Sequence, residues 1–571
     1  MIRKVLLITL VFVSCTMVGQ QKKYQFNGAA RGYYFANDLD IDEALDTLTT
    51  RKANYGHTLV DLGVSLYPAK NTEIIAMFRI RNELGGFWGG GTSFNVRQLS
   101  LNGIAGGVVR YNLGDIDVKM TPYTLFNTQE EGIVNEADVF AIRRSIMHYD
   151  MFYMDDNTWR MQGGQVGFGL EFAQLIKEIQ VKGFITRQRP TDGIAVPERL
   201  FGGGSLNIIQ SKNLSVGLNS VNVFDLQETI PDSIQYKNSV HTAEVNLMFP
   251  IAEEIDLGVK SEAGMSSTQY INYSDTRAPE ELNDWFYDAA LVMEMDSKGL
   301  SVTLGYKDVG ADFRSPGSQT KRINYEKFPA LYQQFTNDAI GRPMSYADVI
   351  SGNTENSFRI SEELMSYNAA YNNTTPYGLA TPNRRGVYFE ALREDTALFR
   401  RSFIQVARLS QSRGTGTSEK MNFILAEAGT DVYLNDIIGW KKEIKIGLGV
   451  RYENSSRAGE EYETAKLNST LIDLGLSVEF LTKLDLLLGA KLWNVSGNAF
   501  VNERNRYNTV ENFDIVELDF VENTYAGGLR YRFNENNSVT AQYQLFEIAH
   551  ADEQMADYGM SQFTFLLSLS F

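Results

Sequence analysis

Residues that could do chemistry are few in this chain, and their spacing matches no familiar catalytic centre. Of 571 residues only one is a cysteine and four are histidines, at positions 57, 148, 241 and 550. None of them lies in an HExxH pattern, which brings two imidazoles to one helix face for zinc. No GxSxG sequence occurs, and a serine triad would need a nearby histidine. The sequence therefore predicts a protein that is not an enzyme, with no catalytic residue, no metal site and no cofactor.

Two further patterns resemble ligand sites only in part. Gly89–Gly91 and Gly202–Gly204 lack the Lys-Ser/Thr pair and helix start of a phosphate loop, so they indicate tight turns or bends. The segment Asp38–Glu43 carries alternate acids, as a calcium loop does. Its sixth residue is Glu43 instead of glycine, however, and its twelfth, Thr49, is not an acid. Collection of divalent cations by this acidic segment, beside anionic lipopolysaccharide, is left as an alternative.

Composition excludes some partners and favours one class of fold. The formal net charge of −17 argues against a nucleic-acid partner, which needs basic surface, and fits acidic loops or a cation-preferring lumen. Mean hydropathy is −0.24, and no run beyond the N-terminus approaches the length of a membrane-spanning helix. The 48 glycines and 12% aromatic residues suit a β-barrel, which presents only alternate residues to lipid.

The N-terminus has the sequence pattern of an export signal. A basic start at Met1–Lys4 is followed by an apolar run, Val5–Val13, and small residues up to Gly19. This is typical of a secretory signal peptide, predicted here as residues 1–19, with a single barrel domain at 20–571. The sole cysteine, Cys15, lies in the signal, so the mature chain is expected to have no disulfide. Lipidation of Cys15 is the alternative.

The mature chain alternates in hydropathy with a period of two, which indicates strands whose two faces meet different surroundings. One face is apolar, for example Ile116, Val118 and Met120, and the other carries charge and glycine. Charged residues expected to line the lumen are Asp61, Arg79, Arg81, Asp115, Asp117, Lys119, Lys182, Asp256, Lys260, Glu262, Lys445, Arg451, Asp473 and Glu479. They either pair within a filled barrel or line a permeation path and set its charge preference.

Connections between these strands are alternately short and long, as in outer-membrane barrels with short periplasmic turns and long extracellular loops. We therefore predict an all-β fold, a transmembrane antiparallel up-and-down barrel of about 22 strands, within a range of 18–24. The strands are expected at 24–36, 56–67, 72–83, 94–111, 115–126, 158–172, 177–189, 203–211, 213–226, 237–249, 254–270, 284–297, 299–313, 386–393, 396–411, 419–433, 442–455, 465–480, 484–497, 515–532, 537–549 and 560–571.

Two long connections stand out. The segment 127–157 is expected to be an external loop. The segment 314–385, rich in proline and aromatic residues, could contain a helix at 361–370 and is expected to cap the barrel or to fold inside as a plug. Arg384 and Arg385 end this segment and could anchor it to the acidic wall.

The last strand carries the clearest likeness to a known class. Its alternate apolar residues are Phe563, Phe565, Leu567, Leu569 and Phe571. A final strand that ends in Phe resembles the signal by which Gram-negative outer-membrane barrels are recognised by their insertion machinery. Gly114–Leu125 and Thr375–Arg384 also resemble recurrent motifs of a large, largely uncharacterised, porin-like barrel family of the Bacteroidota. The resemblance implies an outer-membrane location and contact with lipid and lipopolysaccharide.

Two functions follow from this fold. The first is a porin-like channel for small solutes, with 314–385 as its constriction. The alternative is a non-enzymatic scaffold or accessory barrel of an outer-membrane complex for protein insertion, secretion or surface lipoproteins, with a closed lumen and a protein partner. Transport driven by TonB is not expected, because no N-terminal plug domain precedes the first strand.

Overall fold

The structure is a computed structural model, and most of the chain can be described from it. The described residues are 23–41, 52–84, 91–126, 135–151, 159–227, 229–230, 233–271, 281–320, 334–335, 340–341, 360–364, 367–395, 398–504, 510–552 and 557–571. The expected signal peptide, 1–19, lies outside them, as do large parts of 314–385.

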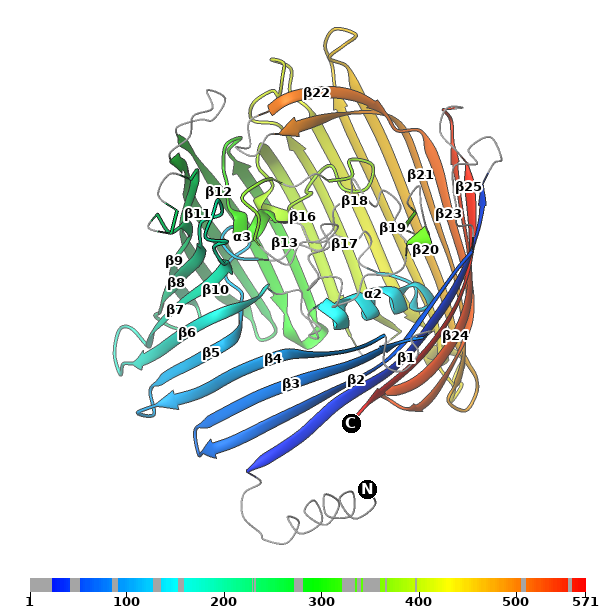
Figure 1. Ribbon diagram of the computed structural model, residues 1–571. Helices are drawn as coiled ribbons and strands as arrows, with labels where there is room; N and C mark the ends of the chain where they lie inside the picture. The colour runs from blue at the N-terminus through cyan, green and yellow to red at the C-terminus, as the bar shows by residue number, and fades with distance from the viewer. Residues whose placement is uncertain are drawn as a thin grey trace.

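All but two of the described strands form one closed antiparallel barrel (Figure 1). Each strand pairs with its neighbours in the chain, and β1 pairs with β25 to close the ring. β22 and β23 both pair with β21, one after the other, so together they make a single strand position of the wall. The described barrel wall therefore has 22 strand positions, and the predicted fold is confirmed.

Most strands of the wall run much as expected, with several longer at their ends. The exceptions are the expected strands 94–111 and 115–126: the turn between them lies at 106–108 and not at 112–114, and the second strand ends at Val118. The strands of the wall are β1 (Tyr24–Ile41), β2 (Lys52–Ala69), β3 (Thr72–Glu83), β4 (Thr92–Ala105), β5 (Val109–Val118), β6 (Trp159–Glu171), β7 (Glu178–Arg189), β8 (Arg199–Ile209), β9 (Leu214–Asp225), β10 (Gln235–Ala252), β11 (Ile255–Ile271), β12 (Glu281–Met295), β13 (Leu300–Val309), β16 (Arg384–Glu394), β17 (Phe399–Ser410), β18 (Asn422–Tyr433), β19 (Ile444–Arg457), β20 (Ala465–Leu481), β21 (Leu484–Arg504), β22 (Val510–Glu517), β23 (Phe520–Asn534), β24 (Asn537–His550) and β25 (Tyr558–Ser570).

The two faces of the wall differ as a period of two requires. On the outer face large apolar side chains are exposed, among them Phe94 at 63%, Leu291 at 53% and Leu304 at 52%. Trp285 and several tyrosines, such as Tyr306 and Tyr543, are exposed on the same face. Exposed apolar side chains at this density are typical of a surface that meets lipid. None of the described helices is long and apolar enough to cross a membrane.

The inner face is covered by chain that enters the barrel from two long connections. The first, between β5 and β6, contributes 119–126 and the helix α2 (Asp138–Met151), which lies within the ring (Figure 1). The second, between β13 and β16, contributes α3 (Pro316–Gln319), the short pair β14 (Gln334–Phe335) and β15 (Ile340–Gly341), and η3 (Gly378–Ala380). All four residues of α3 are buried.

These insertions correct two expectations. The segment 127–157 is not simply an external loop, since its described part contains α2 inside the barrel. The second concerns the apolar residues of β5: Ile116 and Val118 do not face outward but are 1% and 5% exposed in an apolar cluster inside the ring. The register of β5 with β6 is unbroken from Arg110 to Val118, and Leu113 is 50% exposed on the outer face. A period of two therefore turns Ile116 and Val118, three and five residues later, to the inner face. The helix expected at 361–370 is a further correction, because the described residues there, 361–364 and 367–370, form no helix.

The ring closes where the C-terminal strand meets the first one. The N–H of Gly28 donates to the carbonyl of Phe571 at 2.8 Å, and the N–H of Phe571 donates to the carbonyl of Gly28 at 3.0 Å. The Phe571 ring lies directly over Gly28, where a Cβ would come within 2.6 Å of it. The apolar residues of the expected insertion signal, Phe563 to Phe571, lie on the outer face of this seam.

Replacing Gly28 by alanine should destabilise this seam. The added Cβ would lie 2.4 Å from the carbonyl oxygen of Asp61, so the backbone must shift; overpacking of this kind costs about 1–3 kcal/mol. Gly32→Ala on the same strand is the control, because its nearest atom is 3.7 Å away. Guanidinium unfolding of the detergent-solubilised barrel, followed by tryptophan fluorescence, measures both. Equal midpoints for the two variants would contradict the described seam.

Candidate functional site

The filled interior of the barrel is the candidate functional site, and a groove of small residues receives the start of α2. Gly475 on β20 and Gly489 on β21 are direct partners in the sheet, and both face inward. A Cβ on Gly475 would lie 2.6 Å from the Cβ of Ala137, and one on Gly489 would lie 2.5 Å from Val139 Cγ1. The helix therefore approaches the wall as closely as backbone contact permits. Only glycine leaves room for this approach.

Ion pairs hold the same end of α2. Lys491 on β21 contacts Glu136 at 2.7 Å and Asp473 on β20 at 3.0 Å. Asp473 also accepts the N–H of Ala137 at 3.1 Å. Asp138, in the first turn of the helix, pairs with Lys445 at 3.0 Å; a carboxylate at that position also interacts favourably with the helix dipole. The wall thus binds both the side chains and the backbone at the helix start.

The other end of α2 meets a cluster of arginines on β1–β4. Asp61, with no exposed surface, accepts two hydrogen bonds of 2.7 Å from Arg79 and a further one from Arg97. Tyr149 of α2 donates its hydroxyl to the same carboxylate, and the Arg97 guanidinium lies 4.2 Å from the centre of its ring. His57 contacts Arg31 at 3.2 Å in the same cluster. The buried Asp61 carboxylate of β2 is therefore bonded to three other elements: β3, β4 and α2.

A second anchor holds the insertion between β13 and β16. Glu453 on β19 accepts the N–H groups of Asn373 and Thr374 at 2.8 and 3.2 Å. Arg384 donates to the carbonyls of the same two residues, at 2.7 Å to Asn373 and 2.9 Å to Thr374. Its guanidinium also stacks 3.7 Å from the centre of the Phe423 ring. A single turn is thereby bound through both its donors and its acceptors.

The two insertions also contact one another on the inner face of β10–β13. Tyr123 stacks on Phe286 with ring centres 3.8 Å apart and donates its hydroxyl to Asp288 at 2.7 Å. Tyr388 donates to the other oxygen of Asp288 at 2.8 Å. Ser315, from the second insertion, donates to the Tyr123 carbonyl at 2.7 Å. The segments therefore form one packed unit with the wall.

Two cavities among the described residues are both bounded by β7, β8 and β10, one on each side of an apolar layer. The arginine cavity, about 450 Å³, is lined by Arg189, Arg199, Tyr236 and Tyr270, at the end of the long connections. The lysine cavity, about 470 Å³, is lined by Lys119, Lys182, Asn219 and Glu244. The layer between them comprises buried side chains of the wall and of the insertions: Phe201, Val221, Val223, Val240, Leu125, Phe313 and Ile360.

The structure places the residues expected in the lumen in different surroundings. Asp61, Arg79, Lys445, Arg451 and Asp473 lie in the buried anchors just described or pair with their members. Arg81 pairs with Glu83 at 2.9 Å, and Arg532 contacts Glu479 at 3.6 Å.

The remaining members of that set lie near the lysine cavity or on neighbouring strands. Asp117, Lys119 and Lys182 line the cavity. Lys260 pairs with Glu294 at 3.0 Å, and Thr121 donates to Glu262 at 2.6 Å. Asp115 instead accepts the N–H of Leu99 at 2.6 Å, and Asp256 lies opposite Glu294 in the backbone register of β11 and β12.

Of the two expected loop anchors, only Arg384 contacts the insertion through the bonds described. Arg385 is exposed and pairs with Asp308 of β13 at 2.6 Å. Important partners that the sequence did not single out are Arg97, Tyr149, Glu453 and Lys491. The inward glycines were the available signal, since a glycine at a lumen position leaves space for another segment.

Comparisons with known proteins identify no family. No family model matches the sequence, and no curated protein matches it. Among solved structures it is similar to the outer membrane protein OpdK from Pseudomonas aeruginosa, at 10% identity and a TM-score of 0.36 over 97% of this chain and 100% of that one. A BenF-like porin from Pseudomonas fluorescens aligns at 10% identity and a TM-score of 0.37, over 97% and 100%. Acinetobacter baumannii OccAB3 aligns at 9% and 0.33, over 96% and 100%. The likeness to these barrels is distant and carries no argument about solute or mechanism.

Filling the glycine groove should displace the start of α2. Gly475→Ala should raise amide hydrogen exchange in 135–142 about tenfold or more, because the added methyl group collides with Ala137 and weakens local packing. Gly447→Ala on β19 is the matched control, since its new Cβ meets only Asp431 Oδ1, at 3.5 Å. Exchange followed by mass spectrometry resolves the segment. The groove is refuted if both variants exchange like the parent.

The neighbouring arginines provide a test of the second anchor. Arg384→Leu removes the donors to the Asn373 and Thr374 carbonyls, so exchange in 370–378 should rise by about tenfold. Arg385→Leu removes only an exposed ion pair with Asp308, and exchange there should stay within about twofold of the parent. If the two substitutions have the same effect, Arg384 is not an anchor.

Proposed function

We propose that this protein is an outer-membrane channel for small solutes, narrowed by the two inserted segments. The observation that carries the proposal is the pair of cavities inside the ring. Charged and polar side chains line part of each, and both are bounded by β7, β8 and β10, so they mark one route parallel to the wall. A polar route within a barrel of apolar outer surface is what solute passage across lipid requires.

The proposed location rests on the outer face of the barrel and on both ends of the chain. Large apolar side chains with about half of their surface exposed cover that face, and a soluble protein would not expose so many. Residues 1–19 have the pattern of an export signal. The last strand places Phe563, Phe565 and Phe571 on the outer face, where insertion machinery could recognise them during biogenesis. Lipid and lipopolysaccharide would then surround the barrel.

A closed scaffold in an outer-membrane complex is the second candidate, and the apolar layer favours it. Phe201, Val240 and Phe313 are fully buried between the two cavities. Such a layer excludes water until some of its members move. In a scaffold it would remain closed, and a protein partner in the membrane would account for the function.

Two deletions designed from the structure separate these functions. Asn383 donates its N–H to the carbonyl of Gly310 at 3.1 Å, so Asn-Gly can replace 311–382 as a two-residue hairpin turn. Val118 and Trp159 are likewise paired, so Asn-Gly can replace 119–158. We expect liposomes with the parent protein to admit small neutral sugars slowly. The double deletion should admit them at least about tenfold faster, because a 22-strand ring without a plug encloses a wide lumen.

Folding of each variant is checked by heat-modifiable migration before the flux is measured. Flux through the parent above that of protein-free liposomes supports the channel. Flux only after deletion means that the native lumen is closed, which overturns the channel and favours the scaffold. Purification from native membranes should then yield a partner in fixed stoichiometry.

A further inference from the structure

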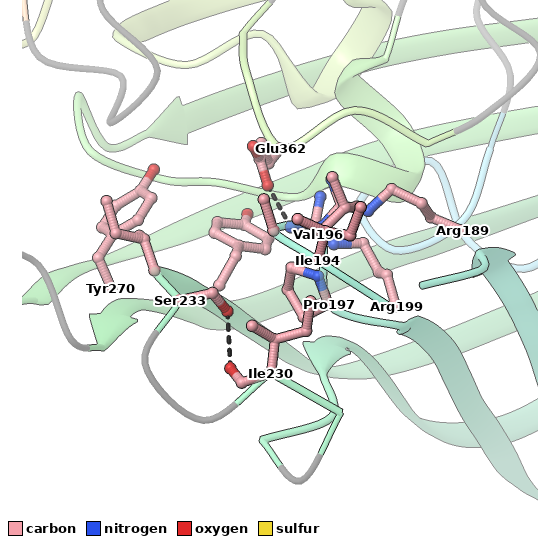
Figure 2. Close-up of a pocket in the computed structure, with 12 residues that line it drawn as sticks. Arg189, Ile194, Val196, Pro197, Arg199, Ile230, Ser233, Tyr270 and Glu362 are labelled. Carbon is pink, nitrogen blue, oxygen red and sulfur yellow. Dashed lines mark hydrogen bonds and ion pairs between the residues drawn. The ribbon is translucent and has the colours of Figure 1, made fainter. Parts of the chain in front are cut away.

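The arginine cavity has the features of a ligand site. It is bounded by the loop between β7 and β8, by residues before β10 and by Glu362 of the second insertion (Figure 2). Its volume of about 450 Å³ lies within the range of roughly 300–1,000 Å³ that is typical of small-molecule sites. Apolar side chains form much of its wall: Ile194, Ala195, Val196, Pro197, Ile230 and Ile234.

The wall formed by the β7–β8 loop has a defined shape. The Asp192 carboxylate accepts the N–H groups of Val196, Ile194 and Ala195 at 2.8, 2.9 and 2.9 Å. These bonds stabilise the ionised form and hold the pKa of Asp192 below its usual range. The loop is therefore held in shape by its own hydrogen bonds, which lowers the entropy that binding would otherwise cost.

Arg199 is fixed with one edge directed to the cavity. Asp225 accepts from its Nε at 2.6 Å and from its Nη2 at 2.8 Å, which is the bidentate geometry of a strong guanidinium–carboxylate pair. Asp225 also accepts the Tyr236 N–H at 3.0 Å, which ties this pair to β10. Glu362, on the second insertion, contacts Arg199 from the other side (Figure 2). A carboxylate carried by an inserted segment therefore already lies at the cationic end of the cavity.

A second donor lies in the same wall. Tyr236 is 2% exposed and lines the cavity, and its hydroxyl has no hydrogen-bond partner among the described residues. A buried hydroxyl without a partner is costly and is usually satisfied by water or a ligand. Arg189, whose side chain is 29% exposed, adds another cation and contacts Asp225 at 3.4 Å. The donors thus converge at one end of an otherwise apolar pocket.

From this geometry we propose that the arginine cavity binds a small carboxylate with an apolar body, and that Glu362 holds the carboxylate position until the ligand displaces it. The inference deepens the proposed channel function by naming a class of solute, and it rests on that function only for its physiological meaning. The ligand carboxylate would take the Arg199 edge now used by Glu362 and accept from the Tyr236 hydroxyl. Its apolar part would cover Ile194, Val196 and Ile234.

Glu362 competes well because it is tethered to the barrel. Its effective concentration at Arg199 is on the order of millimolar, as for a group on a short linker, so a free carboxylate must overcome that competitor. Removal of the Glu362 charge should therefore increase the affinity for a ligand. Removal of a donor should decrease it.

Benzoate is a suitable probe, and calorimetric titration of the detergent-solubilised full chain measures its binding. We expect Glu362→Gln to bind benzoate about tenfold more tightly than the parent, because a charged competitor for Arg199 is lost. Glu363→Gln, an equal charge change at the adjacent exposed residue, should bind like the parent. Benzamide, of similar shape but neutral, should bind about tenfold more weakly than benzoate to every variant.

Tyr236→Phe tests the second donor without disturbing the fold, since it removes only a hydroxyl that has no partner among the described residues. Benzoate affinity should fall by about fivefold to tenfold when that bond to the carboxylate is lost. Equal benzoate affinity in the parent, Glu362→Gln and Tyr236→Phe overturns the site. So does equal binding of benzamide and benzoate.

These results are independent of the flux measurements. Binding with the expected pattern but without sugar flux through the parent supports the site and overturns the channel. Sugar flux without benzoate binding to Glu362→Gln supports the channel and overturns the site.

Discussion

The width of the ring determines most of what is found inside it. In a small barrel the side chains of opposite walls meet and fill the interior, but a ring of 22 strands is too wide for that. Charged residues on the inner face would then remain in water, or another part of the chain must reach them. Here two connections turn inward and supply the missing partners. The burial of Asp61, Glu453 and Lys491 is therefore a property of the inserted segments as much as of the wall.

The anchors are specific because each recognises more than charge. A buried ion pair alone adds little to stability, since the desolvation of both groups opposes their attraction. Glu453 and Arg384 avoid this weakness by binding N–H and C=O groups of one turn, which no shifted register of the insertion would present in the same place. At the start of α2 the wall similarly combines Asp473, which binds a backbone N–H, with two glycines that permit only a close approach. The wall thus selects one arrangement of the filling segments.

The strands of the wall could be predicted from the sequence because the alternation of apolar and polar residues is a local pattern. Every second residue from Ile444 to Tyr452, or from Phe563 to Phe571, is apolar, which indicates the face on which it lies. Short turns mark the strand ends. The contents of the lumen depend on contacts between residues far apart in the chain, such as Ala137 with Gly475, and no local period encodes them. Local reading also fails where inserted chain covers the inner face of a strand. Ile116 and Val118 were assigned to lipid because they are apolar, although they lie on the inner face of β5 and pack in the apolar cluster formed with the insertions.

The helix α2 was missed for a related reason. Its sequence, Asp138 to Met151, mixes arginine, histidine and acids with apolar residues and shows no strong amphipathic period, because it meets polar and apolar partners on several sides. Its clearest signal lies elsewhere in the chain, in the inward glycines of β20 and β21. A glycine on the outer face of a strand leaves a gap toward lipid, whereas one on the inner face of a wide barrel leaves room for chain. Register must be known before the two can be distinguished.

The apolar layer connects the arginine cavity to the rest of the lumen through one short stretch of chain. Ile360 is 4% exposed within that layer and lies two residues before Glu362. Between them, Ser361 donates its N–H to Thr320 at 2.8 Å, next to α3, which is itself buried. A ligand that displaced Glu362 would therefore act on backbone that is continuous with the layer. Because the layer consists of side chains from both the wall and the insertion, a shift of the insertion alone would open contacts between Ile360 and the strands without any change in the barrel. Closure and selectivity would then depend on the same segment, and a solute able to replace Glu362 would also be the solute that loosens the barrier.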